Sequence, residues 1–307
     1  MEPKLLGPSL ILLTLLFAAC TRGPAATPAA SQEAPVTFYL VSTDLAVEET
    51  RFAFGLIGPD RTMIEGARAS LRFIRGSQVV LEGEAIYRSV AIRTPHIHPG
   101  GEVHLHIDTR GLYVVDGVKL DTPGEWNVQA RVTLPDGSGP YLLEQDVIVK
   151  GKSSTPAIGN PVPPTRHKTA RDVSDLSQIS SSEEPIPDFY RVSVAEAVEG
   201  HRPFVVVFAT PAFCQSRLCG PVLEIVAQTI PSYRERVEFI HIEPYDLSLI
   251  RGEGRVQLVE ATVQWGLPTE PWVFVVNGQG RLVAKFEGIL ALEELEGALK
   301  KALAGGT

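Results

Sequence analysis

The chain has 307 residues, which is long enough for two domains of ordinary size. Its composition, with 44% hydrophobic and 21% charged residues, is ordinary for a soluble protein. The 28 Lys and Arg residues are outnumbered by 36 Asp and Glu residues, and the resulting net charge of -8 argues against a nucleic-acid partner.

Residues 1–20 have the features of an export signal. Lys4 and the amino terminus carry positive charge, and residues 5–19 are nearly all apolar but short for a membrane span. The signal ends in LFAAC, which resembles the bacterial lipobox. That resemblance implies that Cys20 is lipidated and anchors the mature chain to the cell membrane, outside the cytoplasm. The alternative is an ordinary cleaved signal in which Cys20 is incidental.

Residues 21–35 are small and dotted with proline, so we expect a flexible tether behind the anchor. Lipidation of Cys20 would also account for the odd number of cysteines, because it leaves Cys214 and Cys219 as a pair.

Residues 36–150 have the pattern of an all-β domain. Short runs of alternating or β-branched character are separated by Gly- and Pro-containing turns, which is typical of a two-sheet sandwich. The runs are VTFYLV, RFAFGLI, ARASLRFI, QVVLEGEAIY, EVHLHI, GLYVV, EWNVQARVTL and LLEQDVIV. Residues 111–132, GLYVVDGVKLDTPGEWNVQARV, resemble a hairpin of extracytoplasmic immunoglobulin-like modules of the YtkA and CopC kind. We expect Trp126 to lie in the core.

One stretch of this domain, HIHPGGEVHLHID, is rich in histidine. The four histidines form two His-x-His pairs and are His96, His98, His104 and His106. Each pair points to one face of its strand, and an odd-length loop between the strands would bring both pairs to the same face. Up to four imidazoles would then converge, enough for copper or zinc. We favour the alternative, a solvated histidine-rich hairpin, because a register slip of one residue would scatter the ligands.

Residues 151–187 are rich in proline, serine and charge, with little apolar periodicity, so we expect a linker there. A second domain follows over residues 188–307. It begins with a short helix that Ser193 caps, and Glu196 completes a capping box.

The central stretch of the second domain is residues 204–226, FVVVFATPAFCQSRLCGPVLEIV. Residues 204–208 form a continuous apolar run that suits a strand buried on both faces, and a helix is expected from about Val222. Cys214 and Cys219 lie in the turn between them. A helix N-terminus favours the thiolate over the thiol, and Arg217 would add to this effect. We therefore predict a redox-active dithiol, in preference to a structural disulfide or two inert buried thiols.

Two further elements of the second domain follow the cysteine turn. Residues 236–246 are expected to form a strand on which His241 is a satisfied interior histidine, with a proton shuttle as the alternative. Residues 255–265 are expected to form a helix with Val256, Val259 and Val263 on one side.

Residues 191–304 resemble the thioredoxin superfamily. Besides the cysteine turn, the resemblance rests on residues 270–288, EPWVFVVNGQGRLVAKFEG, which are similar to the paired strands after the family's cis-proline. It implies that Pro271 is that cis-proline, with Pro268 as a competitor, and that Glu270 and Trp272 help shape the substrate groove. It also implies a final helix over residues 292–303. The overall prediction is an all-β sandwich followed by an α/β thioredoxin-like fold.

This chain differs from thioredoxins in the number of residues between the cysteines, four instead of two. Positions five apart on an ideal helix point about 140° apart, so a Cys214–Cys219 disulfide requires Cys214 outside the helix or an unwound first turn. Q-type peroxiredoxins use this spacing, and they resemble the chain at TPAFCQSRLCG. However, they have Thr or Ser three residues before the first cysteine, where this chain has Pro211. Thiol peroxidase activity, which this resemblance implies, is therefore the runner-up.

Copper delivery is a further alternative. Sco-type copper chaperones share the fold and a cysteine pair, but they have a histidine where this chain has Thr269. We predict instead a membrane-anchored thiol–disulfide oxidoreductase that requires no cofactor. Cys214 would be the nucleophile, and Cys219 would resolve the mixed disulfide. The expected partners are exported proteins with thiols or disulfides and a membrane electron donor or acceptor.

Overall fold

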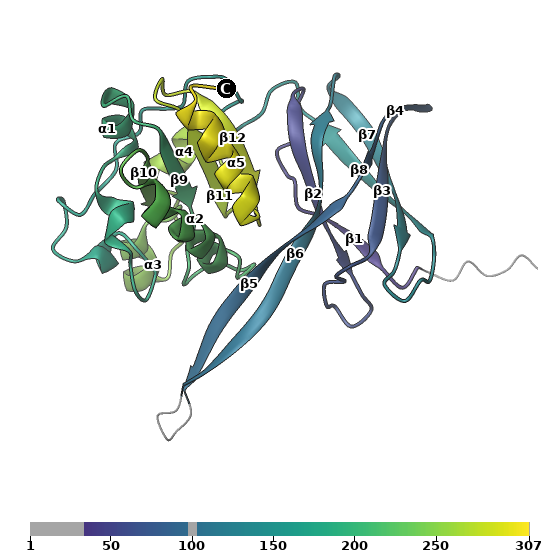
Figure 1. The fold of residues 1–307 in the computed structure, drawn as a ribbon, viewed down its shortest axis with the longest axis horizontal. Helices are drawn as coiled ribbons and strands as arrows, with labels where there is room; N and C mark the ends of the chain where they lie inside the picture. Colours follow the sequence, from purple (N-terminus) through teal and green to yellow (C-terminus); the bar gives the residue numbers. More distant parts are fainter. Residues whose placement is uncertain (1–33, 98–102, 307) are drawn as a thin grey trace, which may run out of the picture. The chain divides into compact units, whose positions relative to one another are not determined.

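Strands dominate the described part of the chain. The computed structural model describes residues 34–97 and 103–306, and over residues 91–97 and 103–110 it describes the backbone alone. Within these residues, twelve strands form three four-stranded sheets (Figure 1). The predicted signal at residues 1–20, with Cys20, and nearly all of the predicted tether lie outside the described residues. None of the described helices has the length and apolar character needed to cross a bilayer.

The first two sheets pack face to face as the predicted sandwich. One has the order β1-β2-β6-β5 and the other the order β4-β3-β7-β8. Their strands are β1 (Thr37–Leu40), β2 (Glu49–Ile57), β3 (Arg68–Arg75), β4 (Gln78–Glu84), β5 (Ile86–Ile97), β6 (Val103–Lys119), β7 (Gly124–Thr133) and β8 (Tyr141–Val149). Alternate residues of both sheets form a shared core that includes Phe54, Phe73 and Tyr113. Trp126 is 2% exposed, which confirms its predicted place in this core.

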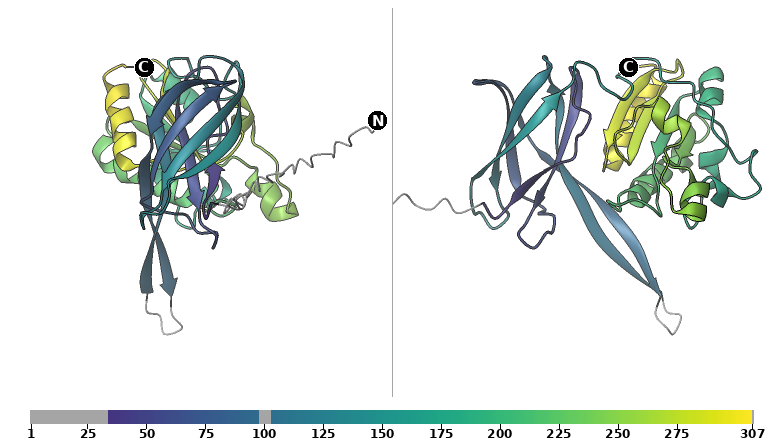
Figure 2. Two further views of the ribbon diagram at one scale, coloured as in Figure 1. Left: turned by 90° about the vertical axis from the view of Figure 1, so that its right-hand side faces the viewer. Right: turned by 180° about the vertical axis from the view of Figure 1, so that it is seen from behind.

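Three predictions about these strands were wrong. The run at residues 78–87 is not one strand, because the chain changes sheets at Ala85, where the N–H donates to the Ala69 carbonyl at 2.8 Å. Residues 111–132 are not a hairpin, because β6 and β7 belong to different sheets. The expected strands at residues 102–107 and 111–115 are parts of the single strand β6. Beyond its pairing with β2, β6 continues with β5 as a two-stranded ribbon (Figure 2).

The third sheet has the order β10-β9-β11-β12. Its strands are β9 (Phe204–Phe208), β10 (Glu238–Ile242), β11 (Trp272–Val276) and β12 (Leu282–Glu287), with β9 parallel to β10 and antiparallel to β11. One face packs against helices α2 (Cys219–Tyr233) and α5 (Leu292–Leu303). The other packs against α1 (Val194–Glu199) and α4 (Glu260–Gln264). The central strand β9 is fully buried, as its apolar run predicts.

Residues 151–187 pack against the third sheet. Gly159 and Val162 donate backbone hydrogen bonds to Leu282 and Gly280, so this segment lies along the edge strand β12. Two 3-10 turns follow, η1 (Leu176–Gln178) and η2 (Pro187–Tyr190). These hydrogen bonds pair backbone groups at the start of β12, which is an edge strand of the third sheet. The predicted domain boundaries within residues 1–307 stay predictions.

The predicted helix at residues 255–265 is only partly present. Its first half is extended, because Asp246 donates to the Gln257 carbonyl and Val259 donates to the Pro244 carbonyl. The helix α4 therefore begins at Glu260, and a separate helix α3 (Leu247–Glu253) precedes the extended stretch. Val256 and Val263 are 71% and 64% exposed, so the expected apolar face is absent. In α1, by contrast, both bonds of the predicted Ser193–Glu196 capping box are present.

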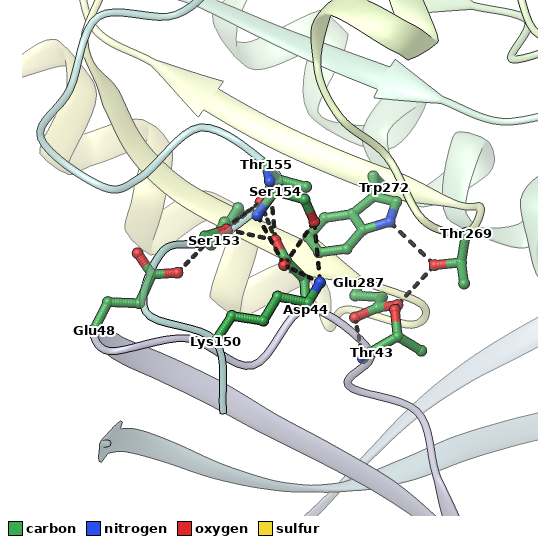
Figure 3. Close-up of polar contacts among 11 residues, drawn as sticks. Thr43, Asp44, Glu48, Lys150, Ser153, Ser154, Thr155, Thr269, Trp272 and Glu287 are labelled. Atoms are coloured by element: carbon green, nitrogen blue, oxygen red, sulfur yellow. Dashed lines mark hydrogen bonds and ion pairs between the residues drawn. The ribbon is translucent and has the colours of Figure 1, made fainter. Parts of the chain in front are cut away.

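Polar contacts join the sandwich to the third sheet and to the segment between them (Figure 3). The Asp44 carboxylate accepts hydrogen bonds from the hydroxyl groups of Ser153, Ser154 and Thr155 and from the backbone N–H groups of the last two. Lys285 of β12 forms an ion pair with Glu48 at 2.6 Å. Residues 34–307 group as one compact unit.

Candidate functional site

The cysteine pair lies where β9 leads into α2. Cys219 is the first residue of α2, and Cys214 lies in the turn before it. The two are joined in a disulfide, with Cα atoms 6.1 Å apart, a separation within the usual range for bridged cysteines. Cys214 therefore lies outside the helix, which is one of the two arrangements that the spacing requires.

The two sulfur atoms have different surroundings. Cys219 is 0% exposed and packs in the core beneath α2, whereas Cys214 is half-buried and its Sγ lies 3.2 Å from the Ser216 hydroxyl. Arg217 is exposed, and its backbone has a φ of 58° where its N–H donates to the Cys214 carbonyl. An attacking group from solvent thus reaches Cys214 more easily than Cys219.

The N-terminus of α2 carries no acidic residue in its first turn and no side-chain cap. The first N–H groups of α2 and its partial positive charge therefore lie next to Cys219, and no acidic side chain in the first turn offsets that charge. Such a position stabilises a thiolate once the disulfide is reduced.

The peptide bond between Glu270 and Pro271 is cis, which distinguishes Pro271 from its competitor Pro268. The Glu270 carboxylate accepts a hydrogen bond from the Tyr245 hydroxyl at 2.7 Å. The Pro271 carbonyl accepts one from the Gly288 N–H at 3.0 Å. This segment is thus held from both sides at the start of β11.

A cavity of about 310 Å³ lies beside the cysteine turn. Its lining includes Ser216 and Leu218 from between the cysteines and Glu270 and Pro271 from the start of β11. The sandwich supplies another part of the wall, which includes Tyr39, Val41, Thr43 and Met63. The structure therefore brings the cysteine turn, Glu270 and Pro271 together.

Trp272 is not among the residues that line this cavity. Its side chain is 3% exposed, stacks on Phe274 and lines a different cavity, of about 170 Å³, near Asp44. Its indole N–H donates to the Thr269 hydroxyl at 3.2 Å. The Trp272 side chain therefore contacts the lining of the cavity beside the cysteines through Thr269 without lining it.

His241 lies on β10 with both ring nitrogens hydrogen-bonded, as expected for a satisfied interior histidine. The Tyr190 hydroxyl lies 2.6 Å from Nδ1, and the Ala209 carbonyl lies 2.9 Å from Nε2. Because the carbonyl can only accept, Nε2 carries the proton and Nδ1 accepts from Tyr190. Burial lowers the pKa of His241 to about 4, against the bond to Ala209, which raises it.

Glu243 follows β10 and is also buried. Burial raises the pKa of its carboxyl group, against hydrogen bonds from Ser181. The Thr210 hydroxyl lies close enough to lower this pKa but outside hydrogen-bond geometry. Ser181 also accepts a bond from the N–H of Ala212 in the cysteine turn, so the segment before η2 supports that turn.

The histidine hairpin is described in its backbone only. The backbone register pairs His96 with His104 and Thr94 with His106. His98, and the side chains of His96, His104 and His106, lie outside the described residues. The side chains that are described include no group of three or more His, Cys, Asp or Glu arranged to hold a metal ion.

Comparison with models of protein families finds no match for this chain, and comparison with curated proteins finds none either. The sandwich residues that line the cavity, such as Tyr39 and Thr43, were not predicted from the sequence, and neither was Glu287. No local signal marks them, because their places depend on contacts of the folded chain, such as that of Thr43 with Glu287, 244 positions away.

Proposed function

We propose that this protein is an exported, membrane-anchored thiol–disulfide oxidoreductase that acts on protein disulfides or thiols through Cys214 and Cys219. The observation that carries the proposal is the disulfide between a half-buried Cys214 and a buried Cys219 at the start of α2. A pair that can close into a disulfide at a helix N-terminus has the geometry and the local field that exchange requires.

The exchange proceeds in two balanced steps. The Cys214 thiolate attacks one sulfur of the partner's disulfide, forming a mixed disulfide and expelling the partner's other sulfur as a thiolate. Cys219 gives its proton to the expelled thiolate and attacks Cys214 Sγ, which forms the Cys214–Cys219 disulfide and releases the partner's second thiolate. The partner gains two electrons and the pair loses two. The same steps in reverse oxidise a partner dithiol.

We further propose that the third sheet and its helices are a thioredoxin-like domain. Support comes from the order β10-β9-β11-β12, from the helices on both faces, and from a cysteine turn that shares a cavity with Pro271. Export and lipidation at Cys20 rest on the sequence of residues 1–20. The partners would then be exported proteins, with a membrane electron donor or acceptor restoring the pair.

Trapping tests the roles of the two cysteines. In Cys219→Ser the mixed disulfide cannot be resolved, so insulin, offered as a disulfide substrate, should stay attached through Cys214. Cys214→Ser should attach far less, because the remaining thiol is buried. The double variant Cys214→Ser/Cys219→Ser is the control. Equal trapping by the two single variants would contradict these distinct roles, and stronger trapping by Cys214→Ser would reverse them. Insulin reduction by the double variant at the wild-type rate would refute the proposal.

A further inference from the structure

Glu287, the last residue of β12, accepts hydrogen bonds from two distant parts of the chain. Its carboxylate accepts from the Thr43 N–H at 2.8 Å and the Thr43 hydroxyl at 2.5 Å, both on the sandwich. It also accepts from the Thr269 hydroxyl at 2.7 Å, just before Glu270 and Pro271 (Figure 3). One partly buried side chain therefore joins the sandwich to the segment that precedes Pro271.

The neighbouring contacts fix this segment on both sides of Glu270. On one side, the Thr269 hydroxyl accepts from the indole N–H of Trp272, which pairs directly with Glu287 across the β11–β12 ladder. On the other, the Gly288 N–H donates to the Pro271 carbonyl. Gly288 has a φ of 72°, and a Cβ there would lie 3.2 Å from Val41 of the sandwich. Residues 287 and 288 thus hold both Thr269 and Pro271 while touching the sandwich.

These contacts surround the cavity beside the cysteines. Thr43, Thr269 and Glu287 line it together with Ser216 and Leu218 of the cysteine turn. Burial raises the pKa of Glu287, and the bonds from Thr43 and Thr269 oppose that shift. Loss of either threonine hydroxyl would therefore remove a bond that supports the carboxylate in this position.

We infer that Glu287 is a positioning residue that holds the Thr269–Pro271 segment against Thr43, so that the sandwich helps to set the shape of the cavity beside the cysteine turn, in which a partner polypeptide binds. This inference rests on the proposed function. A partner polypeptide needs the walls of the cavity to align its disulfide, whereas a small disulfide needs only an exposed sulfur. Disturbing the wall should therefore affect only the reaction with a protein disulfide.

The test compares Thr43→Val and Glu287→Gln with wild type in the full-length protein. Removing hydrogen bonds of ordinary strength should raise the KM for insulin by about three- to tenfold. The rate with 5,5′-dithiobis(2-nitrobenzoic acid), a small disulfide, and the redox potential of the pair should stay unchanged. Thr133→Val, at the last residue of β7, is the matched control. It should leave the KM for insulin, the rate with the small disulfide and the redox potential unchanged. Glu287→Gln keeps the test decisive if Thr43→Val folds poorly.

An unchanged KM in both variants, with an active wild type, would overturn the inference and leave the proposed function intact. A parallel fall in the rate with the small disulfide would also overturn it, because the substitutions would then act on the cysteine pair itself. A wild-type protein that reduces neither disulfide would refute the proposed function, and the inference with it.

Discussion

Cys214 and Cys219 lie five positions apart but differ in exposure, and this difference assigns their roles in the proposed exchange. The half-buried Cys214 meets the partner, while Cys219, packed beneath α2, is protected from direct attack by solvent thiols. The residues that support the turn, such as Ser181, come from outside it. The chemistry of the pair therefore depends on residues that the cysteine motif does not include.

His241 provides a test at the same scale. Its pKa of about 4 lies below the ordinary value of 6.5, so the unfolded chain binds more protons than the folded protein between these values. The contribution of His241 to stability is complete above pH 6.5 and is lost as the pH falls toward 4, by up to about 3 kcal/mol. His241→Gln keeps an acceptor for Tyr190 and a donor for Ala209 but does not titrate.

The free energy of unfolding should therefore fall less steeply between pH 6.5 and pH 4 in His241→Gln than in wild type. Denaturant titrations at several pH values measure this slope. Equal slopes in wild type and His241→Gln would mean that His241 is protonated inside the folded protein.

The elements that sequence analysis predicted best are those with a strong local pattern. The strand β9 has the predicted bounds, because its continuous apolar run is set by neighbouring residues. The Ser193–Glu196 capping box of α1 is present for the same reason. The helix α5 has the bounds that the thioredoxin resemblance implies.

Elements that depend on distant partners were not predicted. Nothing near Ala85 indicates that the chain changes sheets there, since β4 and β5 take their places from pairing with β3 and β6. The extended stretch before α4 likewise follows from its bonds to residues 244–246. In the candidate site, Cys214, Cys219 and Pro271 were found from motif and resemblance, whereas Thr43 and Glu287 meet only in the folded chain.

At the scale of the whole molecule, hydrogen bonds from Ser153, Ser154 and Thr155 to the Asp44 carboxylate hold residues 151–155 against the sandwich. Burial acts to raise the pKa of Asp44, but hydrogen bonds from Ser153, Ser154 and Thr155 hold it well below its ordinary value. The carboxylate therefore stabilises the fold above the ordinary pKa of 3.8, and this stabilisation is lost as the pH falls below it.

Asp44→Asn should lower the free energy of unfolding at pH 7 by about 3 kcal/mol, because an amide nitrogen would face donors where a carboxylate accepts. Between pH 5 and pH 3 the gap from wild type should narrow by about 1 kcal/mol, as the wild type loses the contribution of its carboxylate. Asp146→Asn, in an exposed pair with Asn127, is the matched control and should change stability little. An equal difference in the free energy of unfolding between Asp44→Asn and wild type at pH 5 and at pH 3 would contradict this account of Asp44.

The measurement that most directly tests the central claim is the redox potential of the Cys214–Cys219 pair, determined together with the pKa of the Cys214 thiol in the reduced protein. The proposed function predicts a potential above about −300 mV, in the range of exchange catalysts, and a thiol pKa below about 8.5. A potential below about −300 mV, with a Cys214 thiol that stays protonated at neutral pH, would identify a structural disulfide and contradict the account.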